Sequence, residues 1–190
     1  FDAPESNALW LVTTGFTQPS TLWLQDLPPA DSVEQAPTLA SPRMVRRAPD
    51  LFAAEGVLVT QHFATSADGT RVPYFEVRRE GAPLPAPTLL YGYGGFDVSL
   101  LPAYAPVVGK IWVERGGVYV VANIRGGGEY GPTWHRSALK QHRHRAYEDF
   151  VAVARDLVRR GVTTTNQLGA QGGSNGGLLM GNMYAQYPQD

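Results

Sequence analysis

The sequence contains one serine enclosed by glycines, in the run Gly-Gly-Ser-Asn-Gly-Gly at residues 172–177. A strand-like segment, residues 167–171, precedes this run, and a helix-like segment, residues 178–184, follows it. Glycines on both sides permit a sharp turn that lifts the side chain of Ser174 clear of its own backbone. This arrangement predicts a nucleophile elbow, in which a serine hydroxyl attacks a carbonyl carbon and nearby N–H groups hold the oxyanion. The alternative is an ordinary serine in a glycine-rich turn.

Strand and helix patterns upstream of the elbow predict an α/β fold with a parallel sheet. Residues 146–160 carry an apolar stripe of helical period, and Gly161 marks the end of this helix. Four segments read as strands, the first two of them a hairpin about an Asp-Gly turn: residues 57–64, 72–77, 88–91 and 118–122. This succession is typical of an α/β-hydrolase fold, here truncated after the elbow.

The first 48 residues have a different character, because no helical period is present. Residues 8–14 and 20–25 are β-rich runs that predict a hairpin, and a proline-bearing stretch follows at residues 28–49. A hairpin alone is marginal in water, so we expect residues 1–48 to belong to a larger β domain. Residues 49–190 form the predicted α/β domain.

Composition excludes several classes of function. The net charge of −1 gives no general attraction to nucleic acid, and no apolar run is long enough to span a bilayer. The absence of cysteine excludes disulfides, thiolate metal sites and a cysteine nucleophile. We therefore expect a soluble protein without a nucleic-acid or membrane partner, and the sequence leaves open whether it is cytoplasmic or periplasmic.

The histidines are in the wrong place to serve as the base for Ser174. In α/β-hydrolases the acid and the histidine follow the serine in the chain. All four histidines here precede it, at positions 62, 135, 142 and 144. We expect the triad Asp and His to lie beyond Asp190, in the missing part of a longer polypeptide. The 190-residue chain should then be inactive, and its strand at residues 167–171 should expose an apolar edge that promotes aggregation.

Two other glycine-rich segments follow predicted strands. Residues 91–96, Tyr-Gly-Tyr-Gly-Gly-Phe, stand where α/β-hydrolases place the second half of the oxyanion hole. Residues 126–131 match G-x-G-x-x-G, with Glu148 about 20 residues further on, as in dinucleotide-binding sites. That function needs a helix opening on the third glycine, whereas helical period here begins only at Tyr147. A nucleotide-binding module is therefore the weaker alternative.

A basic stretch at residues 136–145 contains the pair His142 and His144. A His-x-His pair can bind a metal, but the flanking arginines would repel the cation and no third ligand is evident. We interpret the stretch as a solvated charged surface, and we interpret His62 and His135 as structural residues. The sequence therefore predicts no metal site.

Three segments together resemble the prolyl oligopeptidase family of serine peptidases. They are residues 89–96, residues 122–131 with Trp134 and His135, and residues 172–179. The resemblance covers about residues 50–190, while residues 1–48 are compatible with the last blade of that family's seven-bladed β-propeller. It implies a peptidase domain, residues 49–190, that lacks its C-terminal strands.

The resemblance also implies roles for four residues. Ser174 would be the acylated nucleophile, and the N–H of Asn175 and the hydroxyl of Tyr93 would hold the oxyanion. Phe96 would line the apolar pocket for the substrate proline. The implied activity is cleavage of short peptides after proline, without a metal or cofactor, on oligopeptides admitted by the propeller.

The family's triad Asp and His, its proline-stacking tryptophan and its substrate-binding arginine have no counterpart within residues 1–190. Proline specificity is therefore open. A carboxylesterase or acylaminoacyl hydrolase with the same elbow is an alternative, as is a relative without catalytic activity.

Overall fold

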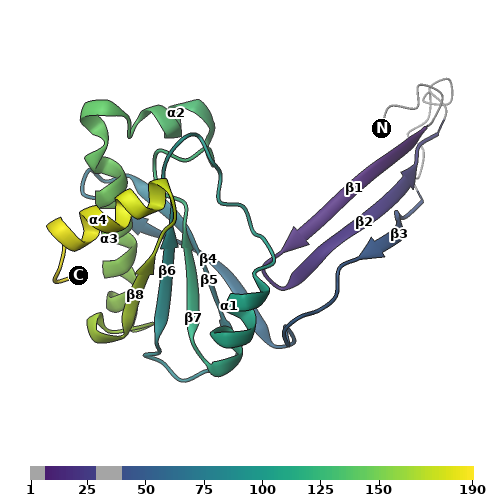
Figure 1. The fold of residues 1–190 in the computed structure, drawn as a ribbon, viewed down its shortest axis with the longest axis horizontal. Helices are drawn as coiled ribbons and strands as arrows, with labels where there is room; N and C mark the ends of the chain where they lie inside the picture. The colour runs from purple at the N-terminus through teal and green to yellow at the C-terminus, as the bar shows by residue number, and fades with distance from the viewer. Residues whose placement is uncertain (1–6, 29–39) are drawn as a thin grey trace. The chain divides into compact units, whose positions relative to one another are not determined.

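The computed structural model describes residues 7–28 and 40–190, which form two compact units (Figure 1). The first unit contains the chain up to Leu51 together with Pro102–Ala105. The second unit contains Phe52–Leu101 and Pro106–Asp190. No helix within the described residues is both long and apolar enough to cross a membrane.

The first unit is built on a three-stranded antiparallel sheet of β1 (Ala8–Gly15), β2 (Gln18–Asp26) and β3 (Arg43–Arg47), in that order. Pairing of β1 with β2 confirms the predicted hairpin. β3 lies in the proline-bearing stretch, to which the sequence analysis assigned no strand; residues 29–39 of that stretch lie outside the described residues. All five residues of β3 are exposed, so no buried face marked it in the sequence.

The second unit contains a five-stranded mixed sheet in the order β4-β5-β7-β6-β8. Its strands are β4 (Val57–Thr65), β5 (Arg71–Arg79), β6 (Thr88–Gly92), β7 (Val118–Ala122) and β8 (Leu168–Gln171). β4 and β5 form the predicted antiparallel hairpin, and β6 runs parallel to both β7 and β8. The sheet therefore confirms the predicted α/β class and is the start of an α/β-hydrolase fold. It is mixed rather than parallel throughout, because β5 also pairs antiparallel with β7.

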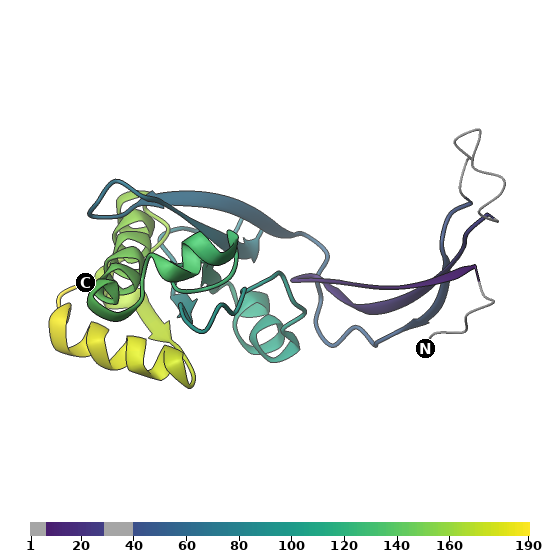
Figure 2. The same cartoon turned by 90° about the horizontal axis from the view of Figure 1, so that it is seen from above.

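Two long helices pack against this sheet. They are α3 (His144–Arg159), which confirms the predicted helix, and α4 (Asn175–Gln186), which follows the serine (Figure 2). Phe150 of α3, Leu179 of α4 and Leu90 of β6 are buried in one core cluster. This shared core fixes α4, and with it the elbow, against the carboxyl end of β6.

The short helices were not predicted from the sequence, because a helix of six residues is too short to show a clear helical period. They are α1 (Pro106–Ile111) and α2 (Gly131–Arg136), with 3₁₀ turns at Val113–Arg115, Lys140–His142 and Thr165–Gln167. The expectation that no helix opens at Gly131 was wrong, since α2 begins there. Pro132 is compatible with this start, because an N–H in the first turn has no intrahelical acceptor.

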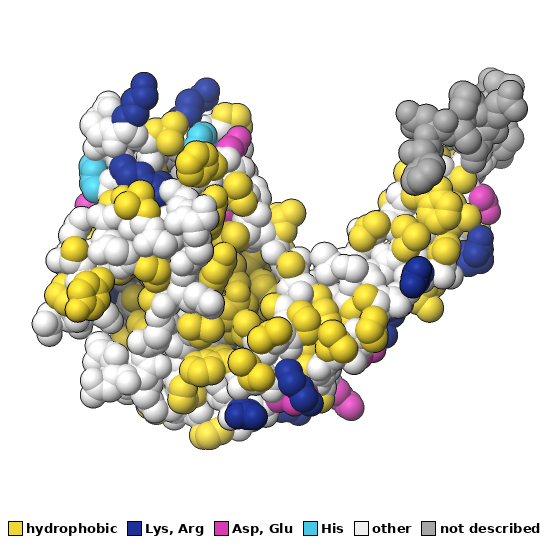
Figure 3. All heavy atoms as spheres, viewed as in Figure 1, with side chains coloured by type: hydrophobic (Ala, Val, Ile, Leu, Met, Phe, Trp, Pro, Cys, Tyr) yellow, Lys and Arg dark blue, Asp and Glu magenta, His cyan; other side chains and the backbone are white. Residues whose placement is uncertain are grey.

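β8 forms one edge of the sheet, as expected for residues 167–171. Gly169, Ala170 and Gln171 are exposed, and no strand of the described residues pairs with the outer edge of β8. Beside β8, an open groove of about 620 Å³ is lined mostly by apolar residues of β8, α3 and α4, among them Leu168, Val151 and Met180. Figure 3 shows hydrophobic side chains gathered over the strands of this unit.

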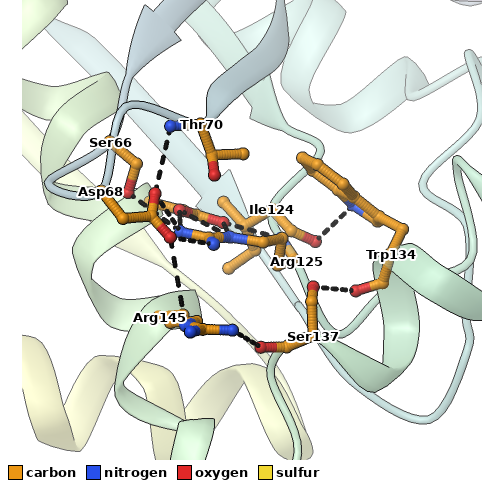
Figure 4. A network of polar contacts seen from close by, with 9 residues as sticks. Ser66, Asp68, Thr70, Ile124, Arg125, Trp134, Ser137 and Arg145 are labelled. Carbon is orange, nitrogen blue, oxygen red and sulfur yellow. Dashed lines mark hydrogen bonds and ion pairs between the residues drawn. The ribbon is translucent and has the colours of Figure 1, made fainter.

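A buried ion-pair network joins the loop after β7 to α3 and to the β4–β5 turn (Figure 4). The Arg125 guanidinium, on a residue 3% exposed, donates from Nη2 to Oδ1 of Asp149, 2.7 Å away, and Asp149 is fully buried. Its Nη1 donates to Asp68 at 2.5 Å, and this arginine holds the pKa of Asp68 well below its usual range. Three separate segments are thus tied to one guanidinium.

We expect Arg125→Met to lower the free energy of unfolding by about 3–5 kcal/mol, because it leaves the buried carboxylate of Asp149 without its cation. The matched control is Arg155→Met, which breaks a bidentate pair with Asp190 at an arginine that is 63% exposed. This change should cost at most about 1 kcal/mol. Urea unfolding followed by tryptophan fluorescence measures both values, and equal midpoints for the two variants would contradict the prediction.

Candidate active site

Ser174 stands at the junction of β8 and α4, as the N-cap residue of the helix. Its backbone has φ 53° and ψ −118°, a conformation that non-glycine residues rarely adopt. The residue is exposed, and the carbonyl oxygen of Ser174 accepts the N–H of Gly177 at 2.8 Å. This conformation and exposure are those expected of the predicted nucleophile elbow, a strained turn at the end of a strand that leaves the serine side chain accessible.

Two glycines of the elbow, Gly172 and Gly176, lie so close to other backbone atoms that a side chain would not fit. A Cβ at Gly176 would lie 2.7 Å from the carbonyl oxygen of Gly92, at the end of β6. A Cβ at Gly172 would lie 2.5 Å from the carbonyl oxygen of Gly176. In contrast, a Cβ at Gly173 would meet no atom within 4 Å. The glycine run therefore lets α4 start directly against β6.

Tyr93 and Asn175 are brought together by a direct hydrogen bond. The Asn175 side chain donates from Nδ2 to the carbonyl oxygen of Tyr93 at 2.6 Å. Asn175 is also the first residue of α4, so its backbone N–H has no acceptor within the helix, and the helix dipole favours negative charge there. The loop after β6 and the elbow after β8 thus meet at one place, which is where the sequence analysis expected an oxyanion hole.

Phe96 is carried on the same loop as Tyr93, three residues further on. Its side chain is 75% exposed, and both Phe96 and Asp97 have positive φ, at 53° and 59°. Two backbone hydrogen bonds hold the loop in this strained shape: Asp97 N–H donates to the Gly126 carbonyl at 3.3 Å, and Val98 N–H donates to the Gly95 carbonyl at 3.0 Å. The aromatic ring is therefore presented outward by a fixed backbone.

The glycines of residues 126–131 serve contacts within the chain. A Cβ at Gly126 would lie 2.4 Å from the carbonyl oxygen of Gly94, and one at Gly128 would lie 2.3 Å from that of Asp97. These glycines let the loop after β7 pack backbone to backbone against the loop after β6. The space that a pyrophosphate would need is filled by the chain itself, which weighs against a nucleotide site.

The interpretation of the basic stretch as a solvated surface was wrong for Arg143. This residue is half-buried, donates from Nη1 to the Gly94 carbonyl oxygen, and donates from Nη2 to Oδ1 of Asn175 at 3.3 Å. Sequence reasoning missed this contact, because nothing in residues 136–145 distinguishes Arg143 from its exposed neighbours Arg136 and Lys140. Among the described residues, no three His, Cys, Asp or Glu side chains gather to hold a metal ion.

Glu129 is a second residue that the sequence analysis passed over. Its Oε1 accepts the N–H of Leu100 at 2.9 Å and lies 3.3 Å from Nδ2 of Asn123. Its Oε2 is buried and has no hydrogen-bond partner within the described part of the chain. Glu129 therefore ties the loop after β7 to the chain that follows Phe96.

Three of the histidines have ring contacts with groups other than Ser174. A ring nitrogen lies 3.1 Å from Arg160 Nη2 in His62, 2.7 Å from the Gly126 carbonyl oxygen in His135, and 3.1 Å from the Gln141 carbonyl oxygen in His144. Burial, helped by the nearby Arg160, lowers the pKa of His62. The ring of His142 lies 6.5 Å from that of His144. The described residues thus place an exposed serine, Ser174, beside the loops that follow β6 and β7.

Comparisons with known proteins agree on one family. The model of the prolyl oligopeptidase family matches residues 107–190. An uncharacterised peptidase of Sinorhizobium fredii is 48% identical over 186 residues, which are 97% of this chain and 24% of that protein. The chain thus spans about a quarter of the length of that relative.

Solved structures give the same result. A prolyl endopeptidase superposes with a TM-score of 0.88 at 35% identity, over all of this chain and 27% of that one. Oligopeptidase B from Leishmania major superposes with a TM-score of 0.84 at 30% identity, over 97% of this chain and 25% of that one.

We expect Gly176→Ala to lower the free energy of unfolding by about 1–3 kcal/mol, because the new methyl group would press on the backbone oxygen of Gly92. Gly173→Ala is the matched control, since a methyl group there meets open space. It should leave stability unchanged or raise it by up to about 1 kcal/mol, through a less flexible unfolded chain. Urea midpoints of the two variants measure the difference, and a Gly176→Ala protein as stable as the control would refute this account of the elbow.

Proposed function

Because the chain belongs to the prolyl oligopeptidase family, we propose that the complete protein is a serine peptidase that cleaves short peptides after proline through an acyl-enzyme on Ser174. The observation that carries this proposal is the strained, exposed Ser174 between β8 and α4. The hydrogen bond from Asn175 to Tyr93 supports it further, since it joins the two loops that would form the oxyanion hole.

The proposed reaction proceeds in two steps. Oγ of Ser174 bonds to the carbonyl carbon of the peptide while a histidine base takes its proton; the C–N bond then breaks and the leaving amine receives that proton. Water hydrolyses the acyl ester in the second step and restores the hydroxyl. The N–H of Asn175 and the hydroxyl of Tyr93 hold the negative oxygen that forms in each step, and Phe96 contacts the proline ring.

We assign the triad Asp and His to chain outside residues 1–190, which agrees with the order serine, acid, histidine in α/β-hydrolases. We also propose that residues 1–48 are terminal strands of a β-propeller and that residues 49–190 begin the peptidase domain. The antiparallel sheet of the first unit, whose strand β3 is fully exposed, supports the former, and the order of the five strands supports the latter. A propeller over the site would admit only short peptides.

In the complete protein, Ser174→Ala should lower kcat on an N-blocked Gly-Pro amide by about 10⁶-fold, because the acyl-enzyme can no longer form. A serine-reactive phosphonate should label the wild type and leave this variant unlabelled. Ser41→Ala, at an exposed serine of the first unit, is the control and should keep full activity. The separate 190-residue chain should react poorly with the phosphonate. Strong labelling of that chain would contradict the proposal that the histidine base lies outside residues 1–190.

The preference for proline is tested by substrate choice. We expect the complete protein to hydrolyse an N-blocked Gly-Pro amide faster than the matching Gly-Ala amide and faster than a short acyl ester. Phe96→Ala should reduce kcat/KM for the Gly-Pro amide by about 10-fold, as expected for the loss of an apolar contact in a pocket. The exposed ring of Phe96 leaves folding little affected by this change. A preference for the ester would instead identify a carboxylesterase or acylaminoacyl hydrolase on the same fold.

A further inference from the structure

Arg143 reaches away from the surface that its basic neighbours occupy. It lies between the 3₁₀ turn Lys140–His142 and the start of α3, and its guanidinium lies 5.5 Å from the centre of the Tyr147 ring. Its Nη1 donates to the carbonyl oxygen of Gly94, in the loop after β6, and its Nη2 donates to Oδ1 of Asn175 in the elbow. One guanidinium therefore bonds both segments that would form the oxyanion hole.

The amide of Asn175 is held at its other end as well. Its Nδ2 donates to the carbonyl oxygen of Tyr93, and a Cβ at Gly95 would lie 2.4 Å from that nitrogen. The amide is thus bonded to Tyr93, pressed against Gly95 and bonded to Arg143. A continuous series of hydrogen bonds therefore links the elbow to the loop after β6, through Tyr93, Asn175, Arg143 and Gly94.

We propose that Arg143 is a positioning residue for acyl transfer, which sets the distance between the hydroxyl of Tyr93 and the backbone N–H of Asn175. This inference rests on the proposed function, because it assigns those two groups to the oxyanion. An oxyanion hole works only when its donors already stand about 2.7–3.1 Å from the place where the charge develops. The two donors belong to segments 82 residues apart in the chain, so their separation depends on a link such as this one.

The chemistry of the side chain fits this task. The planar guanidinium of arginine presents several N–H groups in a rigid fork and can bond two acceptors at once, whereas the ammonium of lysine is a compact point charge on a flexible stem. The full positive charge also lies within hydrogen-bond distance of groups next to the proposed oxyanion, where it favours negative charge. Arg143 itself touches neither the serine nor, in this proposal, the substrate.

The test compares variants of the complete protein on an N-blocked Gly-Pro amide. Arg143→Ala should lower kcat by about 10- to 100-fold and change KM by less than about threefold, because a shift of about 1 Å in a catalytic group costs up to about 100-fold. Arg143→Lys should recover part of kcat. Arg136→Ala, at an exposed arginine of the same basic stretch, is the matched control and should match the wild type. Urea midpoints exclude a loss that comes from unfolding.

A double-mutant cycle separates positioning from a general structural role. Asn175→Ala keeps its backbone N–H but removes the amide that bonds both Arg143 and the Tyr93 carbonyl, so the double variant should lose about as much kcat as Asn175→Ala alone. Fully multiplicative losses would overturn the proposal, as would a folded Arg143→Ala or Arg143→Lys with wild-type kcat. Wild-type protein with no activity on any peptide amide would defeat the proposed function instead, which is a distinct outcome.

Discussion

Close contact between backbones at the carboxyl ends of β6, β7 and β8 is the constraint on which the rest of this structure depends. Gly176 lets α4 begin against the end of β6, and Gly126 lets the loop after β7 lie on the loop after β6. A side chain at either position would separate segments that now share hydrogen bonds. Gly126, Gly128 and Gly176, from two of the glycine-rich motifs, therefore let three loops meet beside a single serine.

Much of this could be predicted from the sequence, because the information was local. The elbow around Ser174, the Asp-Gly hairpin and the apolar stripe of α3 each follow from neighbouring residues. The strand β3 and the helix α2 could not be predicted, since β3 exists by pairing with β2 and α2 is too short to show a period. The direct bond between Asn175 and Tyr93 joins residues far apart in sequence, and only the fold could reveal it.

The contacts that the sequence did not predict are mostly made by charged residues. Arg125 and Arg143 each look like ordinary members of polar segments, yet one is buried against Asp149 and the other is bonded to Gly94 and Asn175. In both cases a guanidinium forms hydrogen bonds between segments that are far apart in the sequence. Burial of apolar groups sets the layers of this fold, whereas planar cations set the relative position of its loops.

The backbone at Ser174 and Phe96 has a consequence for how this protein can change. Both residues occupy positive φ, where glycine would relax the turn and a side chain is maintained at a cost of about 1–3 kcal/mol. Replacing either residue by glycine would relax its backbone, but it would also remove the proposed nucleophile or the ring beside it. Engineering for heat resistance should accordingly leave both positions untouched and seek its gains elsewhere.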